Sequence, residues 1–335
     1  MASTLNLKRK TRRSKYKSKT HHINHVNSII IGTNANGLVG KKDSLLANIE
    51  LFKPMACLIQ ETKVSRKNSI KIPNYQIFEQ LRSNGEGGSL CTAIHEKMNP
   101  VYVSCGENDI EILVVQAEFS DKKCRFINAY GPQEGADRSH ILEFYSKLDQ
   151  EIKNAKILEC LIFLEMDANA KLGCDIIPGD PHTLSSNGEY LLDIIQSNNL
   201  VILNADEKCE GLFTRERKTV TNHEKSIIDY AIICQEMYLF FVKMKIDSEN
   251  ALCKYQMKKN KMLVTKSYHN LLVCSFNISI RNKFHKNYSN RRQTFNLKDP
   301  EGWSRFKKTH LWGHIKKLYQ RAECTGRGKD LAEKI

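Results

Sequence analysis

Residues 161–170 read LIFLEMDANA, an apolar run followed by acidic and amide side chains. The consecutive apolar residues Leu161–Leu164 are typical of a β-strand that is buried on both faces. Asp167 and Asn169 come just after this run, where a strand reaches the rim of its sheet. A side chain at that rim can reach a cleft while the strand fixes its backbone. This stretch therefore predicts a buried strand that presents Asp167 and Asn169 to a functional site.

Short apolar runs of the same kind recur between about residues 27 and 280 and predict further strands, most of them buried. They are Ser28–Ile31, Ala56–Ile59, Leu113–Phe119, Arg125–Tyr130, Leu200–Leu203, Ser226–Ile233 and Leu271–Ile280. Helical spacing of apolar residues predicts helices over Ser44–Phe52, Ser139–Lys153 and Gly188–Ser197. Many strands and few helices, unevenly interleaved, favour two packed β-sheets with helices outside over a doubly wound parallel sheet. We therefore expect an α/β fold.

Charge is unevenly distributed along the chain, whose formal net charge is +15. Residues 1–25 carry eight Lys or Arg residues and no acid, and residues 281–335 carry fifteen against five acids. We therefore divide the chain into a basic disordered arm (1–26), a catalytic domain (27–280) and a basic, partly helical linker segment (281–335). The arm is predicted to bind nucleic acid through Lys8, Arg9, Lys10, Arg12 and Arg13. A solvated tail and a nuclear localisation signal are the alternatives for the arm.

The cellular compartment is indicated by what the sequence lacks. There is no run of about 18 apolar residues, so no membrane association is expected, and the basic N-terminus does not resemble a secretory signal. The 11 cysteines are odd in number, scattered and without a C-x-x-C pair. This pattern favours buried, reduced thiols over disulfides or a zinc site. We expect an intracellular, nuclear protein with no obligate protein partner.

Polar residues also follow or interrupt the other predicted strands, and their order along the chain is informative. Each one alone is weak evidence, because Asn and Asp favour strand ends for backbone reasons and a lone His is more often structural. The carrying motifs are Asn34-Ala35-Asn36-Gly37, Gln60-Glu61-Thr62, Gly85-Glu86-Gly87-Gly88, Asn128-Ala129-Tyr130-Gly131-Pro132, Asp167-Ala168-Asn169-Ala170, Ser226-Ile227-Ile228-Asp229-Tyr230 and Ser267-Tyr268-His269.

Together, these motifs resemble the endonuclease/exonuclease/phosphatase superfamily, and more closely the apurinic-endonuclease-like domain of non-LTR retrotransposons. The resemblance covers roughly residues 27–280. It implies a four-layer α/β sandwich of two packed mixed β-sheets flanked by helices. Residues 291–306 resemble the linker that follows such domains, and no reverse transcriptase follows it. We therefore expect a domain fragment or a truncated element.

The resemblance implies a phosphodiesterase that depends on Mg²⁺ or Mn²⁺ and nicks a DNA substrate. Phosphodiester hydrolysis needs a hard cation held by oxygen ligands. Glu61 is the best candidate for a metal ligand, and Asn36 adds a neutral oxygen, directly or through water. Asn34 is implied to position Asp167 or the water that attacks.

The remaining catalytic residues are implied by the same resemblance. Asp167 handles the nucleophilic water, and Asn169 helps to position the phosphate. His269 contacts the phosphate and is oriented and kept charged by Asp229. Tyr130 donates a hydrogen bond to the scissile phosphate. The non-catalytic alternatives are that Tyr130 is a half-buried aromatic residue that caps the sheet and that Asp229 makes a structural hydrogen bond. The Gly85–Gly88 motif is expected to form a tight loop.

The chain departs from the family pattern at three positions. The glycine that usually precedes the catalytic Asp is replaced by Met166, itself preceded by Glu165, and Met crowds the turn if the backbone needs φ > 0. Thr33 replaces an aromatic residue. Tyr268 replaces an aspartate beside the catalytic His, which removes a carboxylate from the metal site.

These departures leave two alternatives to an active DNA endonuclease. The first is a catalytically weakened or dead nucleic-acid-binding remnant, which Met166 and Tyr268 support. The second is a phosphatase of the same fold, against which the basic ends of the chain argue. Loops set the target preference in such sandwiches, so the strand pattern does not identify a target site.

Overall fold

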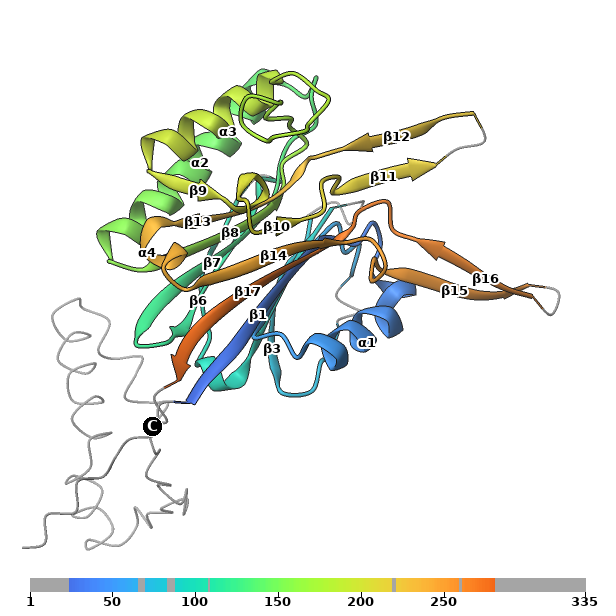
Figure 1. Cartoon of the computed structure of the whole chain (residues 1–335), viewed down its shortest axis with the longest axis horizontal. Helices are drawn as coiled ribbons and strands as arrows, with labels where there is room; N and C mark the ends of the chain where they lie inside the picture. The colour runs from blue at the N-terminus through green and yellow to red at the C-terminus, as the bar shows by residue number, and fades with distance from the viewer. Residues whose placement is uncertain are drawn as a thin grey trace, which may run out of the picture. The chain divides into compact units, whose positions relative to one another are not determined.

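Two β-sheets packed face to face form the centre of the protein (Figure 1). The structure is a computed structural model that describes residues 24–65, 70–82, 88–107, 109–218, 221–258 and 261–280. The predicted basic arm lies outside these residues, except that Asn24–Val26 begin the first strand. The predicted linker segment after residue 280 lies outside them entirely.

The larger sheet contains parallel and antiparallel neighbours, with β1 parallel to β2 and antiparallel to β17. Its strands are, in spatial order, β10 (Cys209–Glu210), β14 (Phe241–Asp247), β17 (Leu271–Ile280), β1 (Asn24–Asn34), β2 (Ala56–Gln60), β4 (Leu90–His95) and β3 (Tyr75–Gln80). The second sheet is mixed as well, since β7 and β8 are parallel and the other neighbours antiparallel. Its order is β5 (Val101–Cys105), β6 (Glu111–Phe119), β7 (Lys122–Tyr130), β8 (Leu161–Asp167), β13 (Asp229–Cys234) and β9 (Leu200–Ile202).

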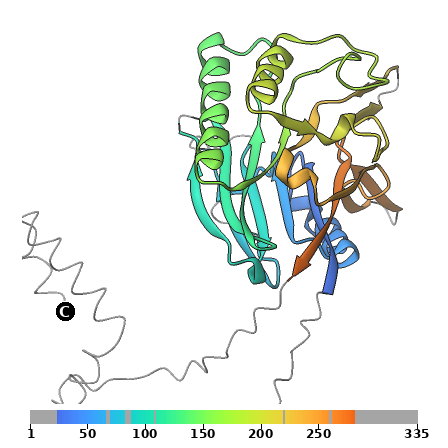
Figure 2. The same cartoon turned by 60° about the vertical axis from the view of Figure 1, so that its left-hand side comes forward.

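Helices cover the outer faces of the two sheets. Figure 2 shows α2 (Arg138–Ile157) and α3 (Ser186–Ser197) beside the second sheet, while α1 (Lys42–Phe52) lies beside the larger one. Asp137 accepts a hydrogen bond from the backbone of Ser139 at the start of α2, and Ser185 accepts one from Gly188 at the start of α3. Such caps satisfy backbone N–H groups that have no partner inside the helix. Among the described residues, no helix is both long and apolar enough to cross a membrane.

The hydrophobic core explains why the central strands are continuous apolar runs. β2 and β8 are buried along their whole length, because each has the opposite sheet on one face and other core on the other. Between the sheets, Phe163 of β8 meets Phe276 of β17 edge to face, with ring centroids 6.0 Å apart. A second cluster packs Leu45 of α1 on the outer face of the larger sheet. The predicted four-layer α/β sandwich is therefore confirmed.

Two short hairpins project beside the sandwich and were not predicted. They are β11 (Arg215–Lys218) with β12 (His223–Ser226), and β15 (Cys253–Lys258) with β16 (Lys261–Lys266). The first hairpin interrupts the strand predicted over Ser226–Ile233, because Ser226 ends β12 and β13 begins only at Asp229. The hydroxyl of Thr214 accepts hydrogen bonds from the backbone N–H groups of Ile228 and Asp229 at this break. Asp229 thus stands at a strand start.

Candidate active site

The ends of several central strands meet along one edge of the two packed sheets. Asn34 and Gln60 are register partners at the ends of the parallel strands β1 and β2. Tyr130 and Asp167 are partners at the ends of β7 and β8, and Asp229 starts β13 opposite Asp167. Segments far apart in sequence therefore deliver their polar end residues to one place.

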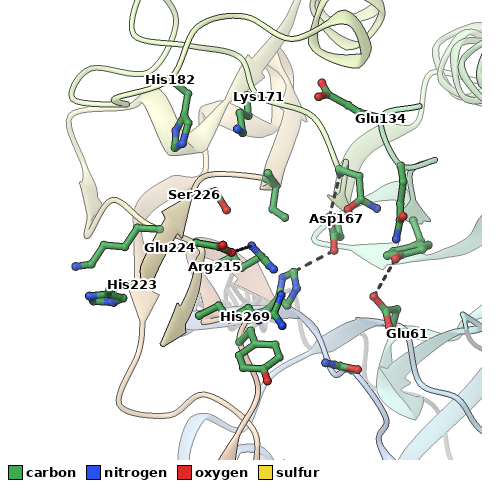
Figure 3. Close-up of a pocket in the computed structure, with 18 residues that line it drawn as sticks. Glu61, Glu134, Asp167, Lys171, His182, Arg215, His223, Glu224, Ser226 and His269 are labelled. Carbon is green, nitrogen blue, oxygen red and sulfur yellow. Dashed lines mark hydrogen bonds and ion pairs between the residues drawn. The ribbon is translucent and has the colours of Figure 1, made fainter. Parts of the chain in front are cut away.

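An open cleft of about 820 Å³ lies at this edge (Figure 3). It is lined by Asn36, Glu61, Tyr130, Asp167, Asn169 and His269, among others. Asn34 and Asp229 are completely buried, and each bonds to a side chain that lines the cleft. The structure thus brings together the predicted metal ligands and catalytic residues. The arm residues Lys8, Arg9, Lys10, Arg12 and Arg13 lie outside the described residues.

Asn34 connects two of the carboxylates that line the cleft, those of Glu61 and Asp167. Its side-chain amide lies 3.0 Å from Glu61 Oε1 and 2.7 Å from Asp167 Oδ2, and donates to both. The hydroxyl of Tyr130 donates to the same Glu61 oxygen at 2.9 Å. On the other side, the backbone N–H of Asn169 donates to Asp167 Oδ1 at 3.0 Å. This network fixes the direction in which both carboxylates point.

Two carboxylates, those of Asp229 and Asp167, lie next to the imidazole of His269. His269 Nδ1 lies 2.9 Å and 3.0 Å from the two oxygens of Asp229 and 3.8 Å from Asp167 Oδ2. Burial alone lowers the pKa of His269, but the charges of Asp229 and Asp167 outweigh it and raise the pKa to about 9. At neutral pH His269 is therefore an imidazolium. With Nδ1 taken up by Asp229, Nε2 is its remaining donor.

The pKa values of Asp167 and Glu61, two of the carboxylates that line the cleft, are shifted in opposite directions. Burial, with the nearby charge of Asp229, raises the pKa of Asp167 to about 7. Burial also acts to raise the pKa of Glu61, but hydrogen bonds from Asn34 and Tyr130 and the Lys63 ammonium lower it below its usual value. At neutral pH Glu61 is thus a stable anion, whereas Asp167 exchanges its proton. Carboxylates whose environments separate their acidities are typical of hydrolytic sites.

Left-handed backbone conformations occur at several residues around the cleft. Four of the twelve described non-glycine residues with positive φ lie there: Asn36 (43°), Glu61 (44°), Lys63 (50°) and Asn169 (46°). The conformation is costly for Glu and Lys, and it is held by a ladder in which Gly37 N donates to Glu61 O at 2.8 Å and Lys63 N to Gly88 O at 3.0 Å. Strain held by surrounding structure is characteristic of functional sites.

The side chains of Glu61 and Asn36 fit a hard divalent cation. They offer oxygen ligands, and the 18% exposure of the Glu61 side chain leaves room for the waters that Mg²⁺ retains. The ammonium of Lys63 lies 3.1 Å from Glu61 Oε2 and 2.7 Å from Asn36 Oδ1, so the chain's own cation already fits between these oxygens. Ligand atoms of Asp167, Asp229 and His269 also lie within 4.8 Å of one another, but Asp229 already binds the imidazole there.

The three residues that depart from the family pattern, Met166, Thr33 and Tyr268, lie in different surroundings. Met166 lies inside β8, is fully buried in the core and does not have positive φ, so the predicted crowding of a turn is wrong. Thr33 is buried and its hydroxyl reaches the carbonyl of Asn270 at 3.4 Å. Tyr268 is 39% exposed at the cleft rim, where the guanidinium of Arg217 lies 5.7 Å from its ring. It supplies no carboxylate to the cleft.

Several residues that shape the site were not predicted. Ser267 donates to the carbonyl of Asn34 at 3.0 Å and accepts from the backbone of His269, which ties the segments carrying both residues together. Arg215 lines the cleft and pairs as an isolated β-bridge with His269. Lys63 could have been suspected because it follows the Gln60-Glu61-Thr62 motif. Ser267 and Arg215 gave no signal, since only their pairing across the fold brings them to the site.

The fold was compared with known proteins. No family model matches the chain, and neither does any curated protein sequence. The solved endonuclease domain of TRAS1, a telomere-specific non-LTR retrotransposon, matches with a TM-score of 0.54 and 16% identity, covering 76% of this chain and 99% of that one. The AP endonuclease LMAP from Leishmania major matches with a TM-score of 0.58 and 12% identity, over 75% and 88%.

The catalytic domain of Xenopus laevis APE2 matches with a TM-score of 0.55 and 16% identity, over 79% of this chain and 100% of that one. At such low sequence identities, the similarity is one of fold alone. The resemblance indicated by the motifs is confirmed at that level: the chain has the fold of these nucleases.

Proposed function

We propose that this protein is a divalent-metal-dependent phosphodiesterase that nicks DNA. The observation that carries the proposal is the convergence of Glu61, Asp167 and His269, from distant parts of the chain, on one open cleft. At neutral pH the three groups play different parts: Glu61 is an anion, Asp167 can accept a proton, and His269 is a cation. Holding a cation, accepting a proton and stabilising phosphate charge are three roles that assist phosphodiester hydrolysis.

Asp167 is the proposed general base. A base works best when its pKa lies near the working pH, and the pKa of Asp167 is raised to about 7. The amide of Asn34, 2.7 Å away, and the backbone of Asn169 hold its carboxylate in place. A water on its open side would lose its proton to Asp167 as its oxygen attacks phosphorus. The P–O bond to one ester oxygen breaks in the same displacement, and that oxygen leaves and takes up a proton from solvent.

His269, Tyr130 and Asn169 are the proposed phosphate contacts. The imidazolium of His269 offers a charged donor, which stabilises the negative charge that develops on the phosphate oxygens. Burial and the charge of Glu61 raise the pKa of Tyr130, so its hydroxyl keeps its proton. That proton is donated to Glu61 in this structure and would turn to a phosphate oxygen once a divalent ion takes the Glu61 carboxylate. Asn36 and Glu61 would hold the divalent ion, which when bound supplies positive charge beside the phosphate.

The surroundings of the cleft favour a polyanionic substrate over a small ester. Hairpin β11–β12 brings Arg215, Arg217 and Lys225 to the cleft, and the loop after β8 adds Lys171. Glu224 of the same hairpin also lines the cleft and offsets the charge of Arg215, 4.0 Å away. We propose that these side chains, together with the basic arm, contact neighbouring phosphates of DNA. The same arm would direct the protein to the nucleus.

A weakened enzyme is the second candidate function, and Tyr268 is the observation that favours it. A phenol at the rim replaces a carboxylate that would add attraction for the ion. Such a protein would bind DNA and nick it slowly.

Nicking of supercoiled plasmid in Mg²⁺ tests the proposal, with release of phosphate from inositol phosphates measured in parallel. We expect nicking that chelation abolishes and that Glu61→Ala weakens, without release from the small esters. Preferential release from the small esters would instead assign a phosphatase, and DNA binding without nicking would assign the remnant.

A further inference from the structure

Lys63 occupies the position between the two side chains proposed to bind the metal. Its ammonium contacts Glu61 Oε2 at 3.1 Å and Asn36 Oδ1 at 2.7 Å. Both contacts engage oxygens that a divalent ion would need. Lys63 and a bound ion therefore compete for the same ligands.

The ammonium of Lys63 can leave its two partners at little cost in free energy. The Lys63 side chain is 41% exposed, so its ammonium can return to water at little cost. Exposed ion pairs of this kind contribute little to stability. The backbone of Lys63 is held by Gly88 and does not need to move when the side chain leaves. A doubly charged ion attracts the Glu61 carboxylate more strongly than a single ammonium does.

A second groove offers the displaced ammonium a place to act. This groove, of about 360 Å³, lies between the 3-10 helix η1 (Val39–Lys41) and hairpin β15–β16. It adjoins the active cleft, since Asn36 and Tyr268 line both. Its basic lining residues are Lys41, Lys63, Lys254 and Lys266.

The chemistry of this groove fits a phosphate. None of the described residues that line it is acidic, and Thr62 and Thr265 add hydroxyl groups. The Lys254 side chain packs over Gly40, where an added Cβ would lie 3.0 Å from Lys254 Cδ, so the hairpin is seated on η1. Lys41 is used internally, because its ammonium donates to the carbonyls of Ala35 and Asn36.

We propose that Lys63 is an exchangeable internal counter-ion: a divalent ion at Glu61 and Asn36 displaces its ammonium into the lysine-lined groove, where it binds a phosphate of the nucleic acid. This inference rests on the proposed function and deepens it. The ion and the nucleic acid then favour each other's binding, because the ion frees a cation for the phosphate. By thermodynamic linkage the effect is reciprocal.

Metal titration without DNA tests the first half of the exchange. The binding of Mn²⁺ is measured by calorimetry for the wild type, Lys63→Met, Lys63→Arg and Lys266→Met. Removing the competing cation should tighten binding about 5-fold in Lys63→Met. Lys63→Arg keeps the positive charge and should bind like the wild type. Lys266→Met removes a charge from the groove without touching Glu61 and should stay within about twofold.

Two outcomes of this titration would overturn the inference. If Lys63→Met and the wild type bind Mn²⁺ equally, the counter-ion role is wrong while the metal site stands. If none of the proteins binds Mn²⁺, the metal site of the proposed function is wrong and the inference is lost with it.

DNA binding tests the second half, in an Asp167→Asn background that prevents cleavage. The affinity for a short duplex is measured with and without Mg²⁺, both for the protein that retains Lys63 and for the one that also carries Lys63→Met. The ion should improve affinity about 5-fold more when Lys63 is present. An equal gain in both proteins would contradict the proposed transfer of Lys63 to a phosphate.

Discussion

Two of the carboxylate–cation pairs at the cleft, His269–Asp229 and Lys63–Glu61, differ in their exposure to water. The side chains of His269 and Asp229 are 7% and 0% exposed, and those of Lys63 and Glu61 are 41% and 18% exposed. The first pair belongs to the protein interior, where charges interact strongly and removal of one partner leaves the other uncompensated. The second pair can exchange its partners with solvent ions. Burial thus separates a fixed charge, at the proposed catalytic residue His269, from the more exposed charge of Lys63.

The backbones that carry the two pairs differ in the same way. Asp229 begins the regular strand β13, next to Asp167 at the end of β8. Glu61 and Lys63 lie in a loop after β2 with left-handed φ angles of 44° and 50°. A regular strand carries Asp229, and an isolated β-bridge to Arg215 holds His269, whereas a loop held by backbone hydrogen bonds carries the proposed metal ligand Glu61.

The largest expected difference between the two pairs is in stability. Asp229→Ala leaves the His269 imidazolium buried without its main partner and should cost about 3–5 kcal/mol. Lys63→Met disrupts only the half-exposed pair and should cost less than about 1 kcal/mol. Urea denaturation of both variants measures the free energies of unfolding. Equal losses in the free energy of unfolding would show that the difference in exposure does not affect the stability that each pair contributes.

Loss of the buried cation should have the next largest effect, on the rate. His269→Gln keeps a side chain that can hydrogen-bond but removes the charge. The nicking rate should fall about 10²- to 10³-fold, as when a preorganised donor to a developing anion is lost. Single-turnover nicking at saturating Mg²⁺ measures the chemical step. A loss below about threefold would remove His269 from the mechanism.

Tyr268→Asp places a carboxylate beside His269 and tests the proposed metal site. The added charge should raise the nicking rate roughly 5- to 30-fold and lower the Mg²⁺ requirement in parallel. Tyr268→Phe, which adds no charge, serves as the control. If the aspartate changes neither the rate nor the Mg²⁺ requirement, a carboxylate at this position is dispensable here.

The pH dependence tests the charge states of the buried side. Activity should rise as Asp167 loses its proton near pH 7 and fall as His269 loses its proton near pH 9. The charge of Asp229 raises both pKa values, so Asp229→Asn should move both limbs of the profile to lower pH. Rates of nicking under subsaturating substrate give the profile. A shift in only one limb would contradict the shared role of Asp229.

The fold could be predicted largely because its central strands are long apolar runs. A strand covered on both faces, such as β8, is apolar at nearly every position and stands out in the sequence. The strands β3, β4, β5, β10 and β14 and the two hairpins were not predicted. Strands with an exposed face, such as β3 and β14, mix polar and apolar residues, and β4 is short and carries Thr92 within its buried run. The sequence FVKMKID of β14 is buried only at part of its positions. Such strands become recognisable only once their partners are known.

The site residues could be predicted where a motif carried them, as for Glu61, Asp167 and His269. The supporting residues could not, because their roles depend on pairing between distant segments. Ser267 matters through the carbonyl of Asn34, and Lys63 through its contact with Asn36. Met166 was misjudged for a related reason: its predicted turn is the last part of a strand, where a large apolar side chain fills the core.

The most direct test of the account is a Mg²⁺ titration of plasmid nicking by the wild type, Glu61→Ala and Asp167→Asn. We propose that Glu61 holds the ion and that Asp167 takes the proton. Glu61→Ala should therefore need about tenfold more Mg²⁺, as expected when a charged ligand is lost, yet recover activity at high concentration. Asp167→Asn should stay at least about 100-fold slower at every concentration, since its base is gone. Recovery of Asp167→Asn by Mg²⁺, or no change in the requirement of Glu61→Ala, would contradict the account.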